Sequence, residues 1–148
     1  VSHCFRVCMV LEHVFGVKDE EMLAAAVLHD VIEDTDVDFD EIKDGFGLQV
    51  AQYVAQISKD RRVDEDKREK EYFKQLRDAD DKVKLIKLAD VYDNLIDSET
   101  AGKDLTAKIL NKCSKYLDAF SGSDDKDVLR AVGIVSELKK QMEEVRHG

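Results

Sequence analysis

Apolar side chains recur every three or four positions along most of the chain, which is the spacing of amphipathic helices. The spacing predicts a first helix that ends near Gly16, with apolar positions at Val7, Val10, Leu11 and Val14. The next run, residues 22–28, is apolar nearly all round and follows the acidic turn 19–21, which suits a helix N-terminus. We therefore expect a buried, central helix there.

The same spacing predicts the remaining elements. Asp38 followed by Glu41 resembles a capping box for a short helix that ends near residues 45–47. Longer helices are expected at about residues 48–57, 67–79, 81–97, 104–120 and 124–146. The last two should pack on the core or on a partner, which includes a second copy of the chain, through Leu105, Ile109, Leu110, Leu117, Leu129, Val132, Val135, Leu138 and Met142.

Composition supports an all-α fold. The 148 residues include 43% apolar and 38% charged side chains, with no proline and only seven glycines, so the residues that punctuate strands and turns are scarce. This length suits one domain with a core of its own. We find no repeat and no linker, and we expect a single domain over residues 1–148 that forms a helical bundle.

Charge and cysteine usage narrow the class of partner. The net charge of −10 argues against general nucleic-acid binding, because the surface repels polyanions. No apolar stretch approaches the roughly 18 to 20 residues needed to cross a bilayer, and the start shows no signal-peptide pattern, so we expect no membrane segment. Three cysteines without a CxxC pair favour the reducing cytoplasm. The first residue is Val, and we expect that sequence is missing before it.

Two local features allow more than one interpretation. Cys4 and Cys8 lie close to His3 and could bind zinc, but we favour buried cysteines on a helix face. Residues 59–71 are almost all charged, with mixed sign, which is typical of an exposed loop leading into a solvated helix. The alternative is that a base of this segment reaches over a pocket to contact phosphate, the candidates being Lys59, Arg61, Arg62 and Arg68.

The strongest chemical signal is the segment 29–41, which holds seven carboxylates, one histidine and no base. If the preceding helix continues, His29, Asp30 and Glu33 fall within an arc of about 100°, with Asp34 at its edge. Imidazole and carboxylate together suit a divalent ion such as Mn²⁺, Fe²⁺, Zn²⁺ or Mg²⁺. Two ligands cannot hold such an ion, so more must come from elsewhere in the chain.

Two further candidates stand at other helices. His3 begins the first helix, and Asp90 lies in the otherwise apolar stretch 87–95, where a charge is costly unless it is paired or bound to a metal. Asn94 lies one turn after Asp90 on the same face. The alternative is a buried hydrogen-bonded cluster without a metal. His13 and His147 have no comparable surroundings and are expected to be ordinary histidines.

These residues together resemble the HD hydrolase domain of the RelA/SpoT family. The resemblance covers about residues 1–97, and in size the chain is most like the small, stand-alone hydrolases of that family, including the metazoan SpoT type. It rests on His3, on His29-Asp30 within AAVLHDVIEDT, on Phe46-Gly47 to Ser58-Lys59, and on Lys87-Leu88-Ala89-Asp90 with Asn94. Residues 98–148 are expected to complete the bundle.

The resemblance implies a Mn²⁺-dependent hydrolase that removes the 3′-pyrophosphate from guanosine tetra- or pentaphosphate. By position, it implies that the metal ligands are His3, His29, Asp30 and Asp90. It also implies that Glu33 and Asp34 are the catalytic acids and that Asn94 lies beside the nucleotide. The family commonly has bases where this chain has Val91 and Ile96, so Lys59 and Lys87 are the candidates here for phosphate contact.

Three other functions remain open at this point. The chain could hydrolyse another nucleotide or a phosphorylated metabolite. It could also be a catalytically silent, nucleotide-binding HD module, although no expected ligand or acid is missing. The third is a structural helical bundle whose acids serve solubility, which metal analysis of the purified protein would separate from the others.

Overall fold

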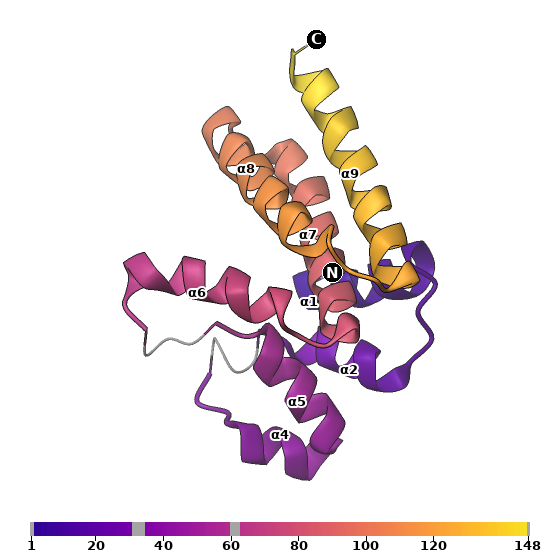
Figure 1. Cartoon of the computed structure of the whole chain (residues 1–148), viewed down its shortest axis with the longest axis vertical. Helices are drawn as coiled ribbons and strands as arrows, with labels where there is room; N and C mark the ends of the chain where they lie inside the picture. Colours follow the sequence, from indigo (N-terminus) through magenta and orange to yellow (C-terminus); the bar gives the residue numbers. More distant parts are fainter. Residues whose placement is uncertain (1, 31–34, 60–62, 148) are drawn as a thin grey trace.

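The computed structural model describes residues 2–30, 35–59 and 63–147, and within these ranges the chain is helical with no β-strand (Figure 1). This confirms the all-α prediction. In chain order the elements are α1 His3–Met9, η1 Val10–Val14, α2 Glu20–Leu28, α4 Phe39–Phe46, α5 Leu48–Ile57, α6 Glu65–Arg77, α7 Asp81–Asp97, η2 Ser98–Thr100, α8 Lys103–Phe120 and α9 Lys126–His147. The five longer helices begin and end within about two residues of the predicted bounds. Among the described residues no helix is both long enough and apolar enough to cross a membrane.

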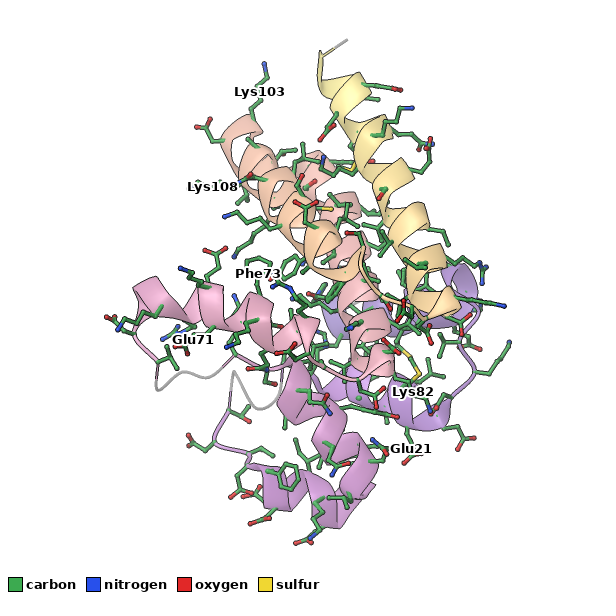
Figure 2. All side chains as sticks on the ribbon, in the orientation of Figure 1. Glu21, Glu71, Phe73, Lys82, Lys103 and Lys108 are labelled. Carbon is green, nitrogen blue, oxygen red and sulfur yellow. The ribbon has the colours of Figure 1, made fainter. Side chains whose placement is uncertain are left out.

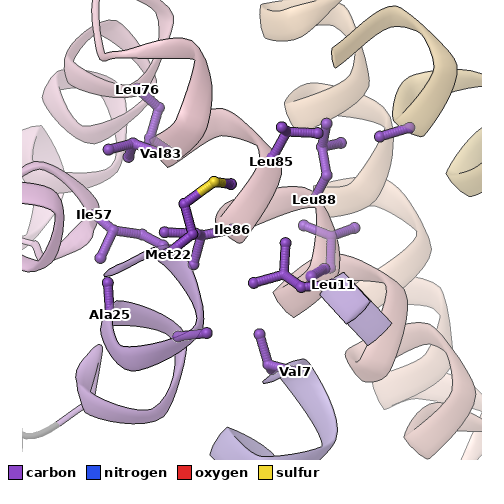
Figure 3. Packing of buried hydrophobic residues seen from close by; sticks show 14 of the residues in the cluster. Val7, Leu11, Met22, Ala25, Ile57, Leu76, Val83, Leu85, Ile86 and Leu88 are labelled. Atoms are coloured by element: carbon purple, nitrogen blue, oxygen red, sulfur yellow. The ribbon is translucent and has the colours of Figure 1, made fainter. Parts of the chain in front are cut away.

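Helix α7 forms the centre of the bundle. It packs against α1, α2, α5, α6, α8 and α9, and ten of its 17 residues are buried. Figure 3 shows Val83, Ile86 and Leu88 of α7 among Val7 and Leu11 from the start of the chain and Met22 and Ala25 from α2. The site described below lies where α1, α2 and α7 meet.

The prediction that α2 is the central helix is wrong. Only Met22, Ala25 and Ala26 are fully buried in α2, because it packs on one flank of the bundle against α1, α5 and α7. Helix α7 takes the central place although it contains charged residues, and the charges are tolerated because they contact one another inside the protein. In this chain, a helix that is apolar on all sides is therefore not the central one, and the central helix is the one whose buried charges are paired.

The start of the chain also departs from a regular α-helix. After α1 the backbone widens into the π-helix η1, where the Phe15 amide donates to the Val10 carbonyl at 3.0 Å. The turn then ends at Gly16, whose φ of 73° is a conformation that favours glycine. The predicted end near Gly16 is confirmed, and the widened turn is a feature that apolar spacing does not reveal.

Caps and tail follow the predictions in part. Asp38 accepts a hydrogen bond from the Glu41 amide at 2.9 Å and begins α4, as its capping signature predicts. In the tail, Leu110 and Val135 are buried, whereas Leu105 and Leu129 are exposed. Leu105 and Leu129 therefore do not pack on the core of this chain, and of the two predicted alternatives only packing on a partner remains for them.

Asp19 begins α2 and also ties it to α7. Its Oδ1 accepts from the amides of Glu21 and Met22, and its Oδ2 accepts from Lys82 Nζ at 3.1 Å. Lys82 stands at the first turn of α7 (Figure 2). Partial burial acts to raise the pKa of Asp19, but the hydrogen bonds from Lys82 and the two amides outweigh it, so the pKa is lowered.

Replacing Asp19 with alanine should lower the free energy of unfolding by about 1 kcal/mol, the usual effect of losing an N-cap. Because the folded pKa lies below the unfolded one, this contribution is present above about pH 4 and is lost as the pH falls through the folded pKa. Urea denaturation at pH 7 and near pH 3 measures both values. Asp44→Ala, on the exposed face of α4, is the control and should change stability by less than about 0.5 kcal/mol. A loss that is equal at the two pH values would contradict the assignment.

Candidate functional site

Three segments bring the predicted metal ligands together. His3 comes from the first residue of α1, His29 and Asp30 from the turn that follows α2, and Asp90 from the middle of α7. His3 Nε2 lies 2.5 Å from Asp90 Oδ1. His29 Nε2 lies 3.4 Å from the same oxygen and 3.3 Å from Asp30 Oδ1. Residues far apart in the sequence therefore meet because α1 and α2 both pack on α7.

The local backbone at His29 differs from the prediction. We expected His29, Asp30 and Glu33 on one continuing helix, but α2 ends at Leu28, and His29 and Asp30 lie in a turn. The imidazole Nδ1 of His29 donates to the Ala26 carbonyl at 2.6 Å. That carbonyl is the one a continuing helix would use for the Asp30 amide, so the side chain competes with the next helical hydrogen bond.

This hydrogen bond fixes the chemical role of the His29 ring. A carbonyl oxygen can only accept, so Nδ1 carries the proton and Nε2 is directed toward the carboxylates. Nε2 is buried, and within the described chain it makes no hydrogen bond. Burial acts to lower the pKa of His29, but the contact with Asp90 outweighs it and raises the pKa. A proton or a divalent cation at Nε2 would relieve the same crowding of acidic oxygens.

His3 lies between two carboxylates. Besides its contact with Asp90, its Nδ1 lies 2.5 Å from Asp93 Oδ2. The hydrogen bond with Asp90, the larger cause, and that with Asp93 raise the pKa of His3 to about 9. With both ring nitrogens next to acceptors, the ring is an imidazolium in this arrangement.

Asp90 uses its two oxygens for different partners. Oδ1 contacts the two imidazoles, whereas Oδ2 accepts from Lys87 Nζ at 2.8 Å. Burial acts to raise the pKa of Asp90, but the Lys87 charge and the two histidines hold it well below its usual range. The Lys87 ammonium also lies over the rings of Tyr72 and Tyr116, at 5.3 and 4.7 Å from their centroids. Asp90 therefore links the histidines to a buried lysine.

The donor set fits a divalent cation. One ligand atom each from His3, His29 and Asp30 lies within 4.8 Å of the others, and Asp90 Oδ1 stands beside both imidazoles. A second reason for an ion is that the buried Nε2 of His29 makes no hydrogen bond to the described residues, although two carboxylate oxygens lie 3.3 and 3.4 Å away, and an unsatisfied buried nitrogen costs about 1 to 3 kcal/mol. Imidazole with carboxylate oxygens suits borderline or hard divalent ions. The four residues therefore fit such a group.

The cysteines near His3 do not favour a thiolate site. Cys4 and Cys8 are half-buried, not buried as we expected. The Cys4 thiol donates to Asp30 Oδ2 at 3.3 Å, and burial together with Asp30 raises its pKa to about 11. Cys4 is thus a neutral thiol that holds Asp30, so the oxygen and nitrogen donors are the better ligands.

A small cavity of about 160 Å³ lies on the Lys87 side of Asp90. All three residues predicted to contact substrate line it: Lys59, Lys87 and Asn94. Among the other lining residues, Lys112 and Tyr116 of α8 carry polar groups that the sequence interpretation missed. Their signal was a spacing of four residues, which places them on one helix face. The ring of Tyr116 contacts that of Phe73 on α6, and their centroids lie 4.6 Å apart.

The sequence interpretation also missed Asp93 and Arg6. Asp93 is buried three residues after Asp90, and Arg6 Nε donates to it at 3.0 Å. Their signal was the spacing of three, which puts Arg6 beside His3 and Asp93 beside Asp90. Glu33, Asp34, Arg61 and Arg62 lie outside the described residues, so their roles remain predictions.

Several known proteins are similar to this chain. A family model described as an HD domain matches residues 1–116. The pyrophosphohydrolases MESH1 of Mus musculus and Homo sapiens, named as acting on guanosine-3′,5′-bis(diphosphate), are each 36% identical over 97 residues. That stretch is 66% of this chain and 54% of each relative, so the chain spans about half the length of these curated relatives. The bifunctional (p)ppGpp synthase/hydrolase SpoT of Escherichia coli is 43% identical over 83 residues, which are 52% of this chain and 12% of SpoT.

Solved structures show the same fold. A metazoan ortholog of SpoT, described as hydrolysing ppGpp, superposes with a TM-score of 0.77 at 27% identity, over 90% of this chain and 77% of that one. A protein from Listeria monocytogenes superposes with a TM-score of 0.76 at 23% identity, over 95% and 93% of the two chains, which supports the fold alone. The family match covers well over half of the sequence. The chain therefore belongs to the HD-domain family.

Proposed function

We propose that this chain is a Mn²⁺-dependent pyrophosphohydrolase that removes the 3′-pyrophosphate from guanosine tetra- or pentaphosphate, leaving GDP or GTP. The observation that carries the proposal is the position of Asp90, which contacts both histidines through one oxygen and Lys87 of the lysine-lined cavity through the other. A cluster suited to a cation thus lies beside a cavity suited to phosphate. The relatives named above act on this nucleotide, which supports the choice of substrate.

In the proposed site His3, His29, Asp30 and Asp90 hold the metal ion. When bound, a divalent ion supplies a Lewis acid that polarises a phosphoryl oxygen and lowers the pKa of the attacking water. The ring of His29 is already oriented by Ala26, and Cys4 holds the Asp30 carboxylate. Manganese is proposed because nitrogen and carboxylate donors suit it and because the RelA/SpoT resemblance implies it.

The cavity supplies the positive charge that a polyphosphate requires. The chain carries a net charge of −10, so a phosphorylated substrate needs a local group of cations. Lys59 and Lys112 provide ammonium donors at the cavity, while the charge of Lys87 is balanced by Asp90. Asn94 is exposed at the same cavity and offers both a donor and an acceptor to the nucleotide.

The proposed reaction needs no covalent intermediate. The oxygen of a water molecule forms a bond to the phosphorus attached to the ribose 3′-oxygen, and the bond between that phosphorus and the ribose oxygen breaks. The ribose oxygen leaves with a proton, and pyrophosphate is released. By the RelA/SpoT resemblance we assign the proton transfers to Glu33 and Asp34, in either order.

Incubation of the purified chain with ppGpp and Mn²⁺ tests this proposal. We expect release of pyrophosphate and GDP, and we expect release to stop when the ion is removed by a chelator. Parallel reactions with Mg²⁺ and Zn²⁺ test the choice of manganese. If no hydrolysis occurs with Mn²⁺ present, the substrate assignment is wrong, and a screen of other nucleotides then tests for a different phosphohydrolase.

Lys112→Ala should raise KM for ppGpp about tenfold and leave kcat within about twofold. The reason is that loss of one charge-assisted hydrogen bond to phosphate removes about 1.5 kcal/mol of binding that is equal in the ground and transition states. Steady-state kinetics measure both constants. Lys115→Ala is the matched control, because Lys115 is also exposed on α8 but does not line the cavity. An equal effect of the two substitutions would show that Lys112 acts only through net charge.

A further inference from the structure

We infer that Asp93 is a positioning residue for the metal ligand His3. It holds the proton on His3 Nδ1, so that Nε2 presents its lone pair to the proposed metal ion, and Arg6 holds Asp93 in place. This inference rests on the metal centre proposed above. Neither the family comparison nor the predicted ligand set assigns a role to Asp93 or Arg6.

The first support is the geometry of the ring. Asp93 Oδ2 lies 2.5 Å from His3 Nδ1, while Asp90 Oδ1 lies at the same distance from Nε2. The two carboxylates therefore hold opposite edges of one imidazole. Both come from α7, three residues apart and so on the same face of a rigid, central helix. The ring cannot turn about its χ2 angle without losing both contacts.

The second support is the tautomer that metal binding requires. A neutral imidazole carries one proton, and the nitrogen that binds an ion must be the one without it. If Nε2 binds the ion, Nδ1 must carry the proton and needs an acceptor. Among the contacts of the described residues, that acceptor is the Asp93 carboxylate.

The two histidines of the cluster are then oriented in the same way. His29 Nδ1 donates to the Ala26 carbonyl at 2.6 Å, and its Nε2 is directed toward the carboxylates. Asp93 does for His3 what that backbone carbonyl does for His29. Partners of this kind are usual for metal-binding histidines, because they fix the tautomer and strengthen the ligand.

The third support is that Arg6 compensates the buried negative charge of Asp93. Its side chain is 6% exposed, and a buried carboxylate is costly without a partner. Arg6 Nε lies 3.0 Å from Oδ1 and 3.2 Å from Oδ2, so one donor lies next to both carboxylate oxygens. Arg6 stands one turn after His3 on α1, which couples the position of the ligand to that of the carboxylate. The arrangement forms a chain of contacts from Arg6 through Asp93 to His3.

Isothermal titration calorimetry of the metal-free chain with Mn²⁺ alone tests the inference without using activity. Asp93→Ala should weaken Mn²⁺ binding by about 10- to 100-fold, the usual effect of removing such a partner. Asp93→Asn keeps an oxygen that accepts from Nδ1 and should lose less than about tenfold. Asp97→Ala is the matched control, since Asp97 is an exposed aspartate one turn later on α7, and it should bind as the unaltered chain does.

A second readout separates positioning from a merely structural role. In Zn²⁺-loaded chain with ¹⁵N-labelled histidine, we expect the His3 nitrogen shifts to show a protonated Nδ1 and a metal-bound Nε2. In Asp93→Asn, whose shape is nearly unchanged, the same tautomer should persist, whereas in Asp93→Ala it should be mixed. Circular dichroism of each metal-free variant shows whether it is folded. If the Ala variant is not folded, the His3 nitrogen shifts of the unaltered, metal-loaded chain carry the test.

The outcomes distinguish this inference from the proposed function. If the unaltered chain binds no divalent ion, the metal centre is wrong and the role of Asp93 falls with it. If the unaltered chain binds Mn²⁺ and folded Asp93→Ala binds it equally tightly, the metal centre stands and the positioning role is wrong. A proton on Nε2 of His3 in the metal-loaded chain would overturn the inference as well.

Discussion

Asp90→Ala should lower the free energy of unfolding of the metal-free chain by about 3 to 5 kcal/mol, which is the usual effect of removing one partner of a buried ion pair. Lys87 is buried, and Asp90 is the acidic partner of its ammonium among the contacts that the structure describes. Removal of the carboxylate leaves that charge uncompensated, leaves His3 Nε2 without its partner, and removes the carboxylate that lies 3.4 Å from His29 Nε2. Urea denaturation in the presence of a chelator measures the loss.

The double variant Asp90→Ala with Lys87→Met shows whether the uncompensated charge is the cause. It should be more stable than the sum of the two single changes predicts, with a coupling of about 1 to 3 kcal/mol. The control is the surface ion pair Lys139 and Glu143, whose side chains are 19% and 40% exposed, and Lys139→Ala should cost less than about 1 kcal/mol. Strict additivity at Asp90 and Lys87 would contradict the buried ion pair.

His29→Ala should reduce Mn²⁺-dependent hydrolysis of ppGpp by more than about 100-fold. Removing groups that only orient a metal ligand already costs about 10- to 100-fold, and here the proposed ligand itself is lost. Among the described residues, the group with ligand atoms within 4.8 Å of one another is His3, His29 and Asp30, so it contains no further residue that could replace the Nε2 of His29. Initial rates of pyrophosphate release at saturating Mn²⁺ measure the effect.

His13→Ala is the control for this substitution. His13 is an exposed histidine of η1, so its removal should leave the rate within about twofold. The metal content of His29→Ala should fall together with its activity, which separates loss of the ion from general damage. A His29→Ala variant that keeps more than a tenth of the rate would show that His29 is not a ligand.

The sequence predicted the helices well because apolar spacing and caps are local signals. Residues 48–57 and 81–97 form helices with the predicted bounds, and Asp38 begins a helix as its capping signature indicates. The grouping of His3, His29, Asp30 and Asp90 was also predicted. A charge on a buried helix needs partners, so Asp90 directed attention to the other polar residues of the core.

What the sequence could not predict depends on tertiary contacts. The end of α2 at Leu28 accompanies the hydrogen bond from His29 to Ala26, a choice that helix propensity does not determine. Lys112 joins the cavity only because α8 packs on α6 and α7. Its spacing from Asp90 alone does not distinguish Asp93 from the other acids, because its contact with His3 depends on the packing of α1 on α7.

The pairing of Lys87 illustrates the same limit. From the sequence it was a candidate for phosphate contact, at the edge of the Asp90 face. In the structure it lines the cavity, but its ammonium is held by Asp90 Oδ2 and two aromatic rings. Which of these roles a lysine takes depends on side chains from α6 and α8, which no local pattern places beside it.

The metal content of the chain is the most direct test of the proposed metal centre. Elemental analysis of protein purified without chelator, then incubated with excess Mn²⁺ and passed through a desalting column, measures the ions retained per chain. We expect about one divalent ion per chain, and much less than one in the His29→Ala variant, because the proposed ligands His3, His29, Asp30 and Asp90 lie together in one cluster. Retention of no ion by the unaltered chain would contradict the metal centre and leave a hydrogen-bonded cluster in its place.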